Sequence, residues 1–144
     1  MTVQAGSAER LPLFDRSVDV VHARFAYFFG PGGEPGIAEC LRVLRPGGVM
    51  FVVDNDLRSG TFASWLARSS WAPHHSADDV EAFWRGQGFA LVRVPSRWEF
   101  TSRADLEAVV GIEFPAALAG ELLAEHQGAV VDCHYALYWR RVSP

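Results

Sequence analysis

Two apolar runs decide the fold: Val18-Asp-Val-Val-His-Ala-Arg-Phe25 and Val49-Met-Phe-Val-Val53. Both are rich in β-branched residues and bounded by turn residues, which predicts strands buried on both faces of a parallel sheet. Between them, apolar residues recur at the spacing of one helix face: Ile37, Cys40, Leu41 and Leu44. Strand, amphipathic helix and strand in this order predict a βαβ unit with a right-handed crossover.

The chain after Asp54 continues the alternation of helices and strands. We expect helices after Ser76 and Ser102, because these capping residues precede apolar positions at helical spacing. We also expect helices at 61–67 and 115–125. We expect strands at 89–94 and 135–142. The sequence therefore predicts an α/β fold with a partly parallel sheet of about four strands and helices on both faces. Residues 1–144 should form a single domain with one core, with a helical insertion near 102–127.

Composition narrows the class of protein. The formal net charge is -4, the 13 basic residues are not clustered, and neither a nucleic-acid surface nor an anionic-membrane surface is indicated. The first residues lack the pattern of a signal peptide, and no apolar run approaches the roughly 18 residues of a membrane helix. Cys40 and Cys133 lie too far apart to suggest a zinc site or a disulfide framework. We expect a soluble, cytoplasmic protein whose partners are small molecules or proteins.

A second pattern extends over residues 5–54. Ala5-Gly-Ser-Ala-Glu-Arg-Leu-Pro-Leu-Phe14 precedes the first strand, and Arg42-Val-Leu-Arg-Pro-Gly-Gly48 precedes the next. In order and spacing this resembles class I S-adenosylmethionine-dependent methyltransferases of the type 11 and type 25 kind. Those proteins have a Gly-Asp-Ala-Glu turn, Leu-Pro-Phe, a strand, and Arg-Val-Leu-Lys-Pro-Gly-Gly. The resemblance implies the carboxyl-terminal part of a Rossmann-like methyltransferase domain that methylates a small molecule.

The resemblance also implies where the cofactor S-adenosylmethionine lies. The turn at residues 6–9 would meet the adenine edge, and residues 22–24 at the end of the first strand would meet its methionine or ribose part. Ser7 stands where relatives usually have Asp, and its hydroxyl can accept from the adenine amino group without a charge. An ordinary turn explains Ser7 equally well. The cofactor residues implied in this way are Gly6, Ser7, Ala8, Glu9, His22, Ala23 and Arg24.

Aromatic and acidic residues follow these strands. Four rings could face a sulfonium cation, although we expect at least two of them to be core: Phe25, Tyr27, Phe28 and Phe29. Methyl transfer mainly requires alignment of the reacting atoms and exclusion of water, so no catalytic triad is expected. Asp54, Asn55 and Asp56 could orient or deprotonate a substrate, which makes Asp54 and Asp56 weak catalytic candidates.

The sequence departs from the family before Val3, where no glycine-rich turn or acid-ended strand precedes the pattern. The glycine-rich segment at 30–36 is a poor substitute because Pro31 and Pro35 lack amide donors. We therefore expect these 144 residues to bind S-adenosylmethionine weakly or not at all. The strand at 18–25 would lack its family neighbour, so we expect a homodimer, another partner or the amino terminus at this edge.

Other functions compete with methyl transfer. Asp54-Asn-Asp56 matches the Asp-x-Asp element of many glycosyltransferases, which bind a metal and a nucleotide sugar. A metal site at His74, His75, Asp78 and Asp79 is conceivable, but polar groups at a helix start usually cap it. Cys133 and His134 would point to opposite faces of a strand and could not share a proton. The serious alternative is a non-catalytic, methyltransferase-like assembly or regulatory module.

Overall fold

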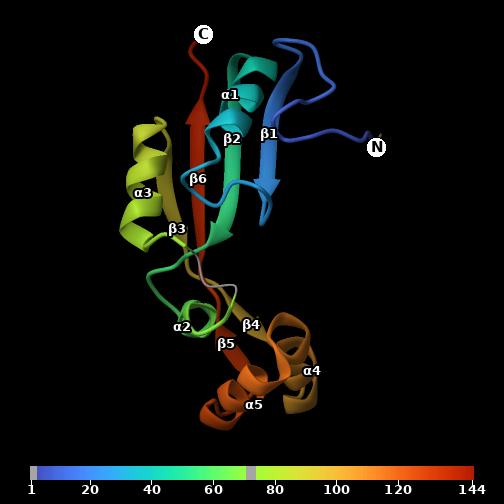
Figure 1. The fold of residues 1–144 in the computed structure, drawn as a ribbon, viewed down its shortest axis with the longest axis vertical. Coiled ribbons are helices and arrows are strands. Elements are labelled where there is room, and N and C mark those ends of the chain that lie inside the picture. The colour runs from blue at the N-terminus through green and yellow to red at the C-terminus, as the bar shows by residue number, and fades with distance from the viewer. Residues whose placement is uncertain (1–2, 71–73) are drawn as a thin grey trace. The chain divides into compact units, whose positions relative to one another are not determined.

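The computed structural model describes residues 3–70 and 74–144 (Figure 1). They divide into two compact units. Unit 1 comprises Met1–Asp54, His75–Val92 and Ala136–Pro144, and unit 2 comprises Asn55–His74 and Arg93–Tyr135. Each unit has buried apolar residues of its own.

A four-stranded mixed sheet, in the order β1-β2-β6-β3, lies mainly in unit 1. β1 and β2 are parallel, with His22 opposite Phe51. β6 runs in the opposite direction (Figure 1): the Val142 N–H donates to Gly48, and at the other end the Asp56 N–H donates to His134. The expected α/β fold is confirmed. The strands are β1 (Val18–Arg24), β2 (Leu44–Asn55), β3 (Ala90–Val94) and β6 (Tyr135–Arg141).

Two helices of unit 1 follow from local sequence signals. α1 (Glu34–Val43) has a proline in its first turn and completes the expected βαβ unit. α3 (Ala77–Gly86) begins at a capping box in which Ser76 and Asp79 bind each other's backbone N–H. Trp84 of α3 is buried and stacks on Tyr138 of β6 at 5.0 Å between ring centroids. Met50 and Val52 of β2 are buried as well.

The two faces of the sheet differ in burial. The face opposite to Met50 and Val52 is less covered. The strand at 18–25 was expected to be buried on both faces, and this is wrong: Val20 is 56% exposed. Alternation along β1 and β2 puts Val20, Phe51 and Val53 on one face, where the β2 residues are only half-buried. The hydrogen bonds between β2 and β6 imply that Phe51 lies opposite the partly exposed Trp139. β1 ends the described sheet, so it has a neighbouring strand on one side only.

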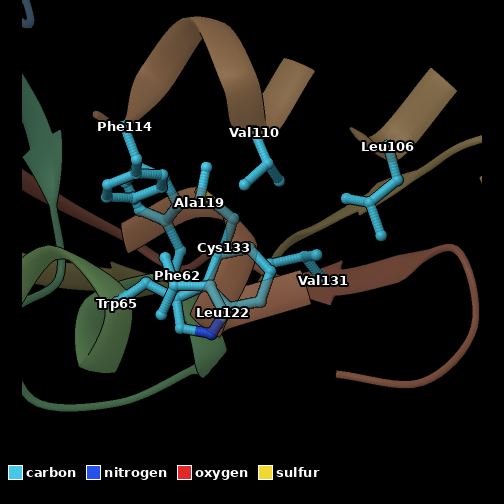
Figure 2. Close-up of a cluster of buried hydrophobic side chains, with 9 residues drawn as sticks. All are labelled: Phe62, Trp65, Leu106, Val110, Phe114, Ala119, Leu122, Val131 and Cys133. Atoms are coloured by element: carbon cyan, nitrogen blue, oxygen red, sulfur yellow. The ribbon is translucent and has the colours of Figure 1, made fainter. Parts of the chain in front are cut away.

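Unit 2 combines three helices with a small antiparallel sheet, β4 paired with β5. The helices were expected and the two short strands were not. Figure 2 shows the core, which draws side chains from α2, α4, α5 and the segment around β5. Within the described ranges, no helix is long and apolar enough to span a membrane. The elements are α2 (Thr61–Ala67), β4 (Arg97–Glu99), α4 (Arg103–Glu113), α5 (Ala116–Glu125) and β5 (Val130–Asp132).

Candidate functional site

The expected adenine-edge turn is a tight turn of unit 1. The Arg10 N–H donates to the Ser7 carbonyl at 3.0 Å, and the Glu9 N–H donates to the Ser7 hydroxyl at 3.2 Å. The hydroxyl retains acceptor capacity, because an oxygen of this kind has two lone pairs. A Cβ on Gly6 would lie 2.7 Å from Pro12 Cδ, so this position requires glycine unless Pro12 moves. The backbone at Ala8 is part of the same turn.

A hydrogen bond joins this turn to the loop after β1. The Tyr27 hydroxyl donates to the Glu9 carboxylate at 2.8 Å. This bond, together with the negative charge of Glu9, raises the pKa of the Tyr27 phenol. The turn at residues 6–9 is therefore tied to the loop that follows β1. Sequence reasoning missed this pair because the residues are 18 positions apart and no local pattern connects them.

The carboxyl end of β1 presents two polar side chains on one face. His22 and Arg24 are exposed and alternate with the half-buried Ala23. The Arg24 guanidinium lies over the Phe25 ring, 5.1 Å from its centroid. Phe25 and Tyr27 have positive φ angles of 49° and 58°, which are uncommon for aromatic residues. Backbone conformations of this kind are concentrated at functional sites, so this loop is a candidate for one.

The four aromatic rings after β1 differ in burial. Phe28 is in the core, 4.9 Å from the Tyr27 ring and 6.4 Å from the Trp84 ring. Tyr27 is half-buried, and a Cβ on Gly36 would clash with its ring. Phe25 and Phe29 are 41% and 56% exposed. Only one ring is fully buried, fewer than expected, which leaves Phe25 and Phe29 accessible to a ligand.

The segment that carries the turn is held on α1. The Leu11 N–H donates to Glu39 at 2.7 Å, and Arg42 binds both Glu39 and Asp15. The hydrogen bond from Arg42 lowers the pKa of Glu39 to about 2. A hollow of about 440 Å³ opens along this segment, with Arg10 at its wall. Its other lining residues are Ala5, Gly6, Leu11, Pro12, Leu13 and Phe14.

Asp56, a weak catalytic candidate, is used structurally. Its buried carboxylate accepts from the Arg58 N–H at 3.0 Å and from the Ser59 hydroxyl at 3.3 Å, and Arg93 lies 3.6 Å away. These partners shape the turn before α2. Asp54 and Asn55 end β2 and are half-buried. In the part of the chain that the structure describes, no three His, Cys, Asp or Glu residues are placed to hold a metal.

The residues considered for a metal site at 74–79 and the pair Cys133 and His134 do not form a catalytic or metal cluster among the described residues. The Asp79 carboxylate accepts from Ser76, which lowers the pKa of Asp79, and acts as the helix cap of α3. Asp78 is in the same first turn, and His74 and His75 are exposed. The Cys133 thiol is buried, and burial raises its pKa. His134 instead contacts the Ser59 hydroxyl through Nδ1, at 3.0 Å.

Sequence comparison identifies relatives for part of the chain. Residues 1–52 match the model of the methyltransferase domain family. Malonyl-[acyl-carrier protein] O-methyltransferase of Methylococcus capsulatus is 33% identical over 106 residues, which are 67% of this chain and 37% of that protein. An uncharacterized methyltransferase of Arabidopsis thaliana is 46% identical over 54 residues, which are 38% of this chain and 15% of that protein. The chain thus spans well under half the length of these relatives.

Solved structures share the fold at low sequence identity. A candidate methyltransferase from Bacillus halodurans C-125 superposes with a TM-score of 0.61 and 17% identity, covering 96% of this chain and 76% of that one. The [4+2]-cyclase SpnF superposes with a TM-score of 0.53 and 15% identity, covering 98% and 57%. These likenesses confirm a Rossmann-like fold. They leave the reaction open because one fold hosts different chemistries.

Proposed function

We propose that this chain, whose fold is like that of class I S-adenosylmethionine-dependent methyltransferases, serves methyl transfer to a small molecule. The family match over residues 1–52 supports this proposal most strongly, since it includes both the turn at 6–9 and β1. The hydrogen bond from Tyr27 to Glu9 adds support, because it ties the turn at 6–9 to the loop after β1.

The residues of unit 1 suit one side of S-adenosylmethionine, whose sulfonium supplies an activated methyl group. The exposed Ser7 hydroxyl can accept from the adenine amino group, and Tyr27 holds the adjacent Glu9 carboxylate in place. His22 and Arg24 offer hydrogen-bond donors at the end of β1. Phe25 and Phe29 offer exposed rings that attract a cation and exclude water. These residues would bind and align the donor.

Titration of S-adenosylmethionine into the 144-residue chain, followed by amide chemical shifts, tests this function. We expect shifts at residues 6–9 and 22–29 with a dissociation constant weaker than micromolar, because the implied residues contact only one side of the cofactor. Shifts confined to other residues would contradict the site. Saturation at micromolar concentrations would contradict the expected weakness.

A non-catalytic assembly module is the second candidate, and the edge position of β1 favours it. An edge strand offers unpaired backbone groups to a partner chain. Absence of any shift with S-adenosylmethionine, combined with self-association through β1, would support this candidate. A glycosyltransferase is less favoured, because the Asp56 carboxylate already has three partners.

A further inference from the structure

A second hollow, of about 340 Å³, lies wholly in unit 2 beside the core of Figure 2. Small-molecule sites commonly have volumes of this order and combine apolar walls with few polar groups. The Phe62 and Phe114 rings, 5.8 Å apart between centroids, belong to its walls and to the core. Ile112 is 82% exposed beside them. The complete lining is Asn55, Phe62, Leu66, Ile112, Glu113 and Phe114.

Glu113 gives this hollow a negative charge. It is the one charged residue of the lining and lies in the last turn of α4, which contains no basic residue. The carbonyl end of a helix already carries negative partial charge, so a carboxylate there is unfavourable without a cation. The charge of Glu113 also helps to raise the pKa of the buried Cys133 thiol.

The neighbouring acids differ from Glu113. On α4, Glu107 pairs with Arg103 at 3.0 Å. On α5, Glu121 and Glu125 both pair with Arg68. Across residues 3–70 and 74–144, by contrast, no ion pair involves Glu113. A bound cation would therefore neutralise a carboxylate that the described residues leave uncompensated.

We propose that this hollow binds an organic cation, namely a protonated amine attached to an apolar body about the size of a phenyl ring. The amine would pair with the Glu113 carboxylate. Its positive charge would also be attracted to the negative partial charge at the carbonyl end of α4. The body would displace water from Phe62, Leu66 and Phe114. The Phe62 and Phe114 rings also attract cations. The inference goes beyond methyl transfer, because the hollow contains none of the residues implied to bind the methyl donor.

Three probes of similar shape and different charge test the site: phenethylamine, phenethyl alcohol and hydrocinnamate. Each is titrated into the full chain near neutral pH while amide chemical shifts are recorded. We expect shifts at residues 55, 62–66 and 112–114, and about tenfold tighter binding of the amine than of the alcohol. Hydrocinnamate should bind most weakly because Glu113 repels it. Equal affinities for all three probes, or shifts located elsewhere, overturn the proposal.

Matched variants separate charge from shape. Glu113→Gln keeps the size of an exposed side chain, so it should fold normally and lower amine affinity about fivefold, toward that of the alcohol. Glu107→Gln removes a carboxylate elsewhere on α4 and should leave amine affinity unchanged. Ile112→Ser should weaken amine and alcohol binding alike. Unchanged amine affinity in Glu113→Gln would refute the assigned ion pair.

Discussion

The Tyr27 phenol reports directly on the junction between the 6–9 turn and β1. The hydrogen bond to the Glu9 carboxylate favours the neutral phenol, and the negative charge of Glu9 disfavours the phenolate. Both effects raise the pKa of Tyr27. We predict that Glu9→Gln moves the Tyr27 ionisation to lower pH. Absorbance titration of tyrosinate in Glu9→Gln, with Tyr27→Phe used to identify the signal, measures the change. An unchanged titration would mean that the bond does not form in solution.

Arg103 caps the end of α5 with several hydrogen bonds. Its guanidinium donates to the carbonyls of Leu123, His126 and Gly128, and no lysine can reproduce this fork. We predict that Arg103→Lys lowers the free energy of unfolding by about 2 kcal/mol. Urea denaturation followed by circular dichroism tests this. Arg97→Lys, which changes an exposed surface pair, should cost much less.

The attachment of the amino-terminal segment to α1 should depend on pH. The hydrogen bond from Arg42 lowers the pKa of Glu39 to about 2, below its ordinary value of 4.5. The stabilisation is therefore present above about pH 4.5 and is lost as the pH falls toward 2. We predict that Glu39→Gln makes the free energy of unfolding, measured by urea denaturation, depend less on pH between about 4.5 and 2. Glu34→Gln on the same helix controls for the loss of one carboxylate.

Elements set by local chemistry could be predicted, and elements set by distant contacts could not. α2 lies at the expected residues. The cap of α3 matches the expectation because Ser76 and Asp79 act within a single turn. β4 and β5 were missed because each has three residues and exists only through pairing with the other. For the same reason sequence reasoning proposed the 6–9 turn but not its bond to Tyr27. Burial of β1 was mispredicted because its apolar residues do not reveal an edge.

At the scale of the whole molecule, each unit has its own buried residues, so we expect a core mutation in one unit to destabilise that unit more than the other. Leu106 is fully buried in the core of unit 2 (Figure 2). We predict that Leu106→Ala lowers the stability of unit 2 by about 3 kcal/mol and leaves amide protection in β1 and β2 nearly unchanged. Hydrogen exchange resolved along the chain measures both. Equal loss of protection in the two units would show that they unfold as one.

The free edge of β1 should govern self-association. β1 ends the described sheet and carries Val20, which is 56% exposed, so its outer backbone groups can pair with a second copy. We predict a concentration-dependent homodimer that Val20→Lys converts to a monomer, because lysine on an edge strand opposes pairing. Light scattering after size exclusion, over a range of concentrations, measures the mass. Val92→Lys, on the opposite edge strand β3, is the matched control and should remain dimeric. If Val92→Lys dissociates the dimer instead, the contact is at β3. A wild-type monomer at every concentration would contradict the predicted dimer.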